Sequence, residues 1–310
     1  MSDQQESVLS EAYKLLKSGD IEKASTILKE GLVYNLEDEE LIFALHCCNF
    51  WIDCIRRMEN LKDSYEKGES LLLEWKSFQL VIKREKKTFE LALYAIKTGV
   101  FTLALECYKE IEEPKQSSQK GIVLRKLGLC CKELGEFDLA KTYLMQANEV
   151  SPGSALILAE LADCYALCGE ERQSKVLFRE AFFLDAASID LSFLDSELIR
   201  CLIQKVQEKK YTGAVLLEWI PVYGQLFGVF NVKRKLRPQE VGKLRQEIYA
   251  KENEMKDPSC DSKLITPRLI NLYFWIIDYY VLAENENSRI NDILIRIKIL
   301  DSEIYNLYVK

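Results

Sequence analysis

Histidine, proline and glycine are scarce in this chain. Its 310 residues include a single His, 6 Pro and 13 Gly. A lone His46 excludes most catalytic and metal-binding arrangements that depend on imidazole groups. So few Gly and Pro leave little material for the tight turns of an all-β sandwich or barrel. The composition therefore favours helices, and we expect neither a metal nor a cofactor.

Several functional signals are also missing. The N-terminus, Met-Ser-Asp-Gln-Gln-Glu, has neither a positive leader nor an apolar core, so we expect a cytoplasmic protein. The 10 Cys include no C-x-x-C pair and sit among apolar residues, which predicts small buried side chains. Phosphate-loop, dinucleotide, nucleophile-elbow and zinc-protease motifs are absent. The chain is therefore expected not to be an enzyme, although carboxylate chemistry stays open.

The overall composition indicates a folded protein. Hydrophobic residues make up 48% of the chain and charged residues 29%, which is enough apolar material for a large core. The net charge of -7 argues against a general nucleic-acid binder, which normally presents a basic face. The length exceeds that of one ordinary core, so either two domains or a repeat array is expected.

Residues 121–154 and 155–188 align at a spacing of 34 residues. The matched positions are Leu124 with Leu158, Leu127 with Leu161, Gly128 with Ala162, Gly135 with Gly169, Leu144 with Phe178, and Ala147 with Ala181. Apolar residues recur three and four apart on either side of each glycine, which predicts two helices per unit. The small residues, with Ala140, are expected to let neighbouring helices approach closely. Such a period is typical of repeat proteins.

This pattern resembles the tetratricopeptide repeat family. The family motif places a large apolar residue, Leu-Gly, an aromatic, a turn Gly, Ala, an aromatic, Ala and a closing Pro in a frame of this length. In 121–154 these positions hold Leu124, Leu127, Gly128, Cys131, Gly135, Ala140, Leu144, Ala147 and Pro152. Cys131 and Leu144 stand where the family usually has aromatic residues. The resemblance implies an α-solenoid of helix pairs.

Three further units are predicted upstream. A copy at 85–118 would turn at Gly99 and close at Pro114, and a looser copy at 5–38 would turn at Gly19. Between them, 39–83 is interpreted as a degenerate pair with helices near 40–57 and 60–83. The predicted repeat domain is therefore 1–190, and its acidic run 37–40 is expected to mark a helix start.

Residues 191–310 lose the repeat frame but keep helical patterns. Helices are predicted near 194–209, 211–219, 238–254, 266–284 and 286–308, with Pro238 and Pro267 in first turns and Thr266 as a cap. The last helix carries an apolar seam, expected to pack on the helix before it: Ile290, Ile293, Ile297, Leu300, Ile304 and Leu307. We interpret this region as a helical block that caps the solenoid.

The segment 211–237 allows a second interpretation. It is nearly all apolar up to Phe230 and is followed by a basic run. Glu218 and Pro221 in its middle argue against an unbroken membrane-spanning helix. An interfacial anchor remains an alternative, because Trp219, Tyr223 and the basic run would suit a lipid headgroup boundary. A buried helix followed by a loop is the preferred interpretation.

The resemblance also implies where a ligand would bind. Ligands of this family commonly lie in a concave groove lined by the first helix of each pair. The corresponding positions chosen here as the partner-binding groove are Lys86, Phe89, Leu93, Arg125, Leu129, Lys132 and Asp163. Lys86, Arg125 and Lys132 would bind acidic groups of a peptide, and Phe89, Leu93 and Leu129 would take apolar side chains.

The sequence thus favours a cytoplasmic scaffold or adaptor that binds a peptide or helix of another protein, without nucleic acid. One alternative is a peripheral membrane adaptor that docks through 211–237. Another is an enzyme whose site lies in 191–310. The partner and the oligomeric state are not determined by these patterns.

Overall fold

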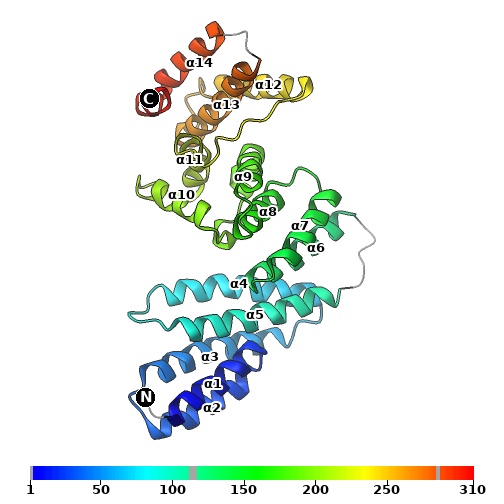
Figure 1. The fold of residues 1–310 in the computed structure, drawn as a ribbon, viewed down its shortest axis with the longest axis vertical. Helices are drawn as coiled ribbons and strands as arrows, with labels where there is room; N and C mark the ends of the chain where they lie inside the picture. The colour runs from blue at the N-terminus through cyan, green and yellow to red at the C-terminus, as the bar shows by residue number, and fades with distance from the viewer. Residues whose placement is uncertain (1–2, 112–116, 284–286) are drawn as a thin grey trace. The chain divides into compact units, whose positions relative to one another are not determined.

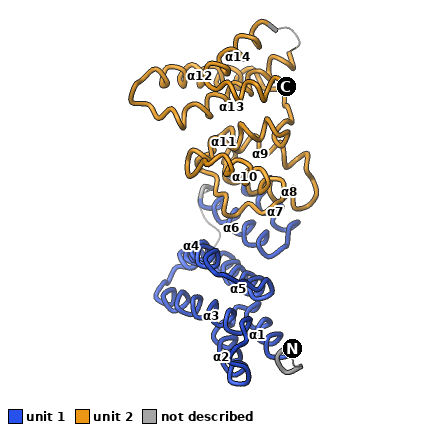
Figure 2. Tube along the Cα trace, turned by 90° about the vertical axis from the view of Figure 1, so that its left-hand side faces the viewer, with its two compact units in different colours: residues 1–151 blue, residues 152–310 orange. Residues whose placement is uncertain are grey.

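The computed structural model describes residues 3–111, 117–283 and 287–310, and every regular element in these ranges is a helix (Figure 1). The predicted all-helical class is therefore confirmed. The chain divides into two compact units, Met1–Ser151 and Pro152–Lys310, coloured separately in Figure 2. This boundary differs from the sequence division at 190/191, because the helix pair 155–188 groups with the C-terminal helices.

Unit 1 contains seven helices within its described residues. They are α1 (Asp3–Lys17), α2 (Ile21–Tyr34), α3 (Glu39–Met58), α4 (Ser64–Ile82), α5 (Glu90–Lys109), α6 (Ser117–Glu133) and α7 (Phe137–Val150). The helices predicted at 40–57 and 60–83 are confirmed as α3 and α4. The acidic run begins α3 as expected, since the Asp38 carboxylate accepts from the N–H groups of Glu40 and Leu41.

Left-handed glycines end the first helix of three pairs. Gly19, Gly135 and Gly169 have φ values of +82°, +85° and +79°, a region that side chains with a Cβ enter at a cost. The predicted turns at these three positions are confirmed. Gly128 also acts as expected, because a Cβ there would lie 2.7 Å from Leu144 Cγ on α7.

The predicted turn at Gly99 is wrong. Helix α5 runs without interruption from Glu90 to Lys109, so 85–118 is not a helix pair. Gly99 is buried inside α5, and a Cβ at this position would lie 1.9 Å from the carbonyl oxygen of Leu16 on α1. The glycine therefore allows two helix backbones to meet. Pro114, the predicted end of this copy, lies outside the described residues.

Helix α5 is the centre of unit 1. It contacts α1, α3, α4 and α6, and its Phe101 ring lies 5.4 Å from that of Trp75 on α4. Among the described residues it is also the one helix long and apolar enough to cross a membrane, judged by length and composition, and 44% of its apolar window is buried within the protein. Its contacts with four neighbours account for this composition.

Unit 2 contains eight α-helices within its described residues. They are α8 (Ala155–Leu167), α9 (Glu171–Asp185), α10 (Glu197–Gln207), α11 (Gly213–Leu226), α12 (Pro238–Glu254), α13 (Ser262–Leu282), α14 (Asn287–Leu300) and α15 (Ser302–Val309). One apolar core joins α8 and α9 to the later helices. Pro238 begins α12 as predicted.

Three details of the C-terminal prediction are wrong. Helix α11 continues past residue 219 to Leu226, because burial of its apolar residues outweighs the N–H that Pro221 lacks. Helix α13 starts at Ser262, one turn earlier than expected, because Asp261 rather than Thr266 caps it, so Pro267 lies inside the helix and not in its first turn. The predicted helix 286–308 breaks at Asp301, whose carboxylate accepts from the Ile304 N–H at 2.9 Å.

The break at Asp301 preserves the predicted packing of the last segment. Helix α14 contacts α13, and both Ile297 and Ile304 of the predicted seam are buried. The Tyr308 ring stacks on Phe274 of α13 at 4.5 Å between centroids. The boundary predicted between the last two helices, at 284–286, lies outside the described residues.

Thiol reactivity should follow burial. Cys47 and Cys48 are buried, and burial raises the pKa of each to about 12, whereas Cys201 is exposed. We expect an aromatic disulfide reagent at pH 8 to modify Cys201 first, because the thiolate is the nucleophile. A Cys201→Ser variant should lose the fast phase and keep the slow ones. Rapid modification of Cys47 or Cys48 in the Cys201→Ser protein would contradict their burial.

Candidate interaction surface

The first three predicted groove residues do not lie on the first helix of a repeat pair. Lys86 is exposed but lies in the connection between α4 and α5, outside any helix. Phe89 is the residue before α5, half-buried, with its ring 5.6 Å from that of Phe43 on α3. Leu93 is half-buried in the first turn of α5. These three residues lie near one end of α5 and do not form the inner face of a helix pair.

The groove residues of α6 are mostly inside the protein. Leu129 and Lys132 are buried, with Lys132 Nζ 3.2 Å from Glu133 Oε1. Arg125 is half-buried, and its charge partly offsets the rise in the pKa of Tyr65 on α4 that burial and Glu69 cause. The predicted groove residues Leu129 and Lys132 are therefore covered by other parts of the chain.

Asp163 binds the backbone at the start of a helix in unit 2. Its buried carboxylate accepts from the backbone N–H groups of Asp195 and Ser196, both at 2.8 Å, just before α10 begins. These bonds replace a side-chain cap, because Ser196 makes no cap bond of its own. Asp163 thus satisfies the start of a helix.

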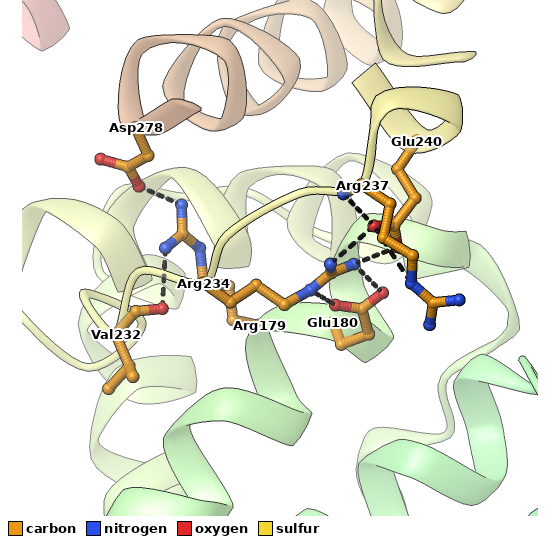
Figure 3. Close-up of polar contacts among 7 residues, drawn as sticks. All are labelled: Arg179, Glu180, Val232, Arg234, Arg237, Glu240 and Asp278. Carbon is orange, nitrogen blue, oxygen red and sulfur yellow. Dashed lines mark hydrogen bonds and ion pairs between the residues drawn. The ribbon is translucent and has the colours of Figure 1, made fainter. Parts of the chain in front are cut away.

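Two residues of the basic run 233–237, Lys233 and Arg234, face carboxylates inside unit 2. The Arg234 guanidinium donates to both carboxylate oxygens of Glu180 on α9, at 2.9 and 3.0 Å, and to both of Glu240 on α12, at 3.1 and 2.9 Å (Figure 3). Burial works against the charged form, but these hydrogen bonds outweigh it and raise the pKa of Arg234. Trp219, Tyr223 and Phe230 are also buried.

A second arginine joins α9 to α13. Arg179 donates to the Val232 carbonyl at 2.9 Å and to the Asp278 carboxylate, and its guanidinium carbon lies 4.4 Å from the centroid of the Trp275 ring (Figure 3). Lys233 Nζ lies 3.2 Å from the other Asp278 oxygen, at ion-pair distance without hydrogen-bond geometry. The preferred interpretation of 211–237, a buried helix and a loop, agrees with these contacts.

A different part of unit 1 presents apolar side chains to solvent. Leu91 and Tyr94 lie one turn apart on α5 and are 66% and 56% exposed. Lys17 of α1 places its ammonium 5.0 Å from the Tyr94 ring centroid, so α1 and α5 form one continuous face here. Exposed apolar pairs rimmed by charge are typical of protein-binding surfaces.

Lys17 is one of five exposed cations on α1 and on the connection that precedes α5. Lys14 lies one turn before Lys17 on α1, and Lys83, Arg84 and Lys86 lie in the connection that leads into α5. In the described part of the chain none of the five has an ion-paired carboxylate, although Glu11 and Glu90 are exposed on the same two helices. We call Leu91, Tyr94 and these five cations the α1–α5 surface.

Sequence reasoning missed this surface for a definite reason. The Lys14–Lys17 and Leu91–Tyr94 spacings are visible in the sequence, but only the passage of α1 across Gly99 brings them together. No family model matches the chain, and no curated protein matches it either. Among the described residues, no group of three or more His, Cys, Asp or Glu side chains is placed to hold a metal ion.

Proposed function

We propose that the protein is a non-enzymatic scaffold or adaptor that holds an acidic segment of another protein, with apolar anchor residues, on the α1–α5 surface. The observation that carries the proposal is that exposed Tyr94, one turn from exposed Leu91, meets Lys17, which has no ion-paired carboxylate among the described residues. Apolar anchors would supply affinity, and the cations would select acidic partners. The tetratricopeptide resemblance of 121–154 and 155–188 supports a binding role.

The site proposed here differs from the groove inferred from the resemblance. Helix α5 contacts α1 and α3, the two first helices of the N-terminal pairs. The chain's own helix thus covers the faces on which a peptide groove would begin. Lys86 is the groove residue that belongs to both interpretations.

A fluorescent acidic peptide with two leucines tests the proposal. We expect Lys14→Glu/Lys17→Glu to weaken its binding by about tenfold or more, because it replaces two attractive contacts by two repulsive ones. The matched control is Lys29→Glu/Lys62→Glu, which makes the same charge change at exposed positions elsewhere on unit 1. Fluorescence anisotropy at two salt concentrations measures both effects. Equal weakening by the two variants would show that net charge alone governs binding.

The membrane-adaptor alternative has less support. Three aromatic side chains of 211–237 are buried, and Lys233 and Arg234 face carboxylates. Phe227, Lys235 and Arg237 remain exposed. Flotation of the protein with anionic vesicles, lost in a Lys235→Glu/Arg237→Glu variant, would favour docking through this segment over the proposed function.

An enzymatic role for 191–310 also finds little support. Burial raises the pKa of Glu218 on α11, and its Oε2 has no hydrogen-bond partner in the described part of the chain. A single carboxyl of this kind gives no pair for acid and base catalysis.

A further inference from the structure

The end of α2 and the connection that follows it present three apolar side chains to solvent. Val33, Tyr34 and Leu36 are 74%, 83% and 76% exposed. Exposed Glu30 precedes them on α2, and exposed Glu37 follows them. We call residues 33–37 the α2–α3 tip. Burial of such side chains in a contact removes a large apolar area from water.

The tip has the chemistry that the α1–α5 surface would recognise. It has an aromatic and an aliphatic anchor flanked by Glu30 and Glu37, whereas the surface offers Leu91 and Tyr94 with cations that have no ion-paired carboxylate in the described part of the chain. The two features thus carry opposite charges, and each presents apolar side chains that could pack against those of the other. Complementary potentials of this kind set partner choice and orientation.

Both features lie on the same side of unit 1. The first residues of α3, just past the tip, contact α1 and the connection that precedes α5, because the Tyr13 hydroxyl donates to Glu40 Oε1 at 2.7 Å and Lys87 pairs with Glu39. The tip is nevertheless exposed in its own chain, so it does not cover the surface beside it. In a dimer with a two-fold axis, the tip of each copy would bind the α1–α5 surface of the other. The two contacts would be identical, as an isologous interface requires.

We propose that the α2–α3 tip of one copy docks on the α1–α5 surface of a second copy, forming a two-fold dimer that competes with the acidic partner. The inference rests on the proposed function, because it uses the same surface. It adds regulation, since self-association would keep Leu91 and Tyr94 covered until a partner displaces the tip. By mass action, the apparent affinity for the acidic partner would then fall as the concentration of the protein rises.

Sedimentation velocity of the full chain over a range of concentrations tests the dimer. A Tyr34→Ser/Leu36→Ser variant should raise the dimer dissociation constant by about tenfold or more, because both apolar anchors are lost. The matched control is Ile295→Ser/Ile299→Ser, which removes two exposed isoleucines from α14 in unit 2. Circular dichroism confirms that each variant is folded. A monomeric wild type, or dissociation by the control instead of the tip variant, would overturn the inference.

A charge-swap experiment identifies the two surfaces as partners. Lys14→Glu/Lys17→Glu and Glu30→Lys/Glu37→Lys should each self-associate weakly and should dimerise when mixed, because in the mixed pair each of the two contacts joins a tip and a surface of opposite charge. No gain on mixing would contradict the proposed contact.

The same variants separate this inference from the proposed function. A monomeric tip variant that binds the acidic peptide at least as tightly as wild type supports both. Peptide binding by a chain that never dimerises refutes the dimer alone. A tip-dependent dimer that does not bind the peptide refutes the acidic-partner proposal and leaves the dimer standing.

Discussion

Gly99→Ala is expected to lower the free energy of unfolding of unit 1 by about 3 kcal/mol. The new Cβ would lie 1.9 Å from the Leu16 carbonyl oxygen, which belongs to the backbone of α1. A backbone atom cannot rotate away, so α1 must move off α5 and the surrounding core must open. This loss exceeds the gain of about 1 kcal/mol that alanine normally brings to a helix interior.

The matched control for Gly99 is Gly242→Ala in α12. Gly242 also lies inside a helix, but a Cβ there meets no atom within 4 Å. We expect this variant to gain about 1 kcal/mol, since only helix propensity changes. Denaturant unfolding followed by tryptophan fluorescence measures both, because Trp75 packs against Phe101 of α5 in unit 1 and Trp275 is buried on α13, the neighbour of α12, in unit 2. If Gly99→Ala matched Gly242→Ala, the close approach of α1 and α5 would be refuted.

Asp278→Ala should destabilise unit 2 by about 3 to 5 kcal/mol, because it leaves the buried Arg179 guanidinium without its counter-ion. Both side chains of this pair are only 5% exposed. Lys233 also loses its partner, but its side chain is 37% exposed and can turn toward water. Trp275, which Arg179 covers, reports the change directly by fluorescence.

Two further variants separate burial from charge at this pair. Glu303→Ala breaks the exposed ion pair with Lys209 in the same unit and should cost at most about 1 kcal/mol. Arg179→Met/Asp278→Leu should regain part of the stability lost in Asp278→Ala, because no unpaired buried charge remains. A double variant less stable than Asp278→Ala would indicate that the bond from Arg179 to Val232 outweighs the ion pair.

Local signals predicted much of the helical framework. The glycines at 19, 135 and 169 end helices because only their backbones need a positive φ. The apolar spacing of 3 and 4 located most helices to within a few residues, and the acidic run marked the start of α3. These features depend on neighbours in the chain, so a single sequence contains them.

Features that depend on distant residues were predicted poorly. Gly99 has the same sequence context as a turn glycine, yet it serves a contact with a helix some eighty residues away in the chain. Lys132 and Asp163 have the spacing of groove residues, but other elements bury both of them. A charged residue on a helix is exposed or paired according to what packs against it, and the repeat frame alone does not specify that.

The sequence by itself determined the helical class, the turns at Gly19, Gly135 and Gly169 and the apolar faces, because each follows from backbone conformation or from a period of 3.6 residues. Only the tertiary structure decided that α5 is a single helix across α1, that Arg179 and Arg234 fasten the basic segment to α9, and that Leu91 and Tyr94 meet Lys17. These contacts join residues that are far apart in the chain. Their free energy comes from side-chain packing and from buried and half-buried ion pairs. A local sequence pattern specifies neither of these.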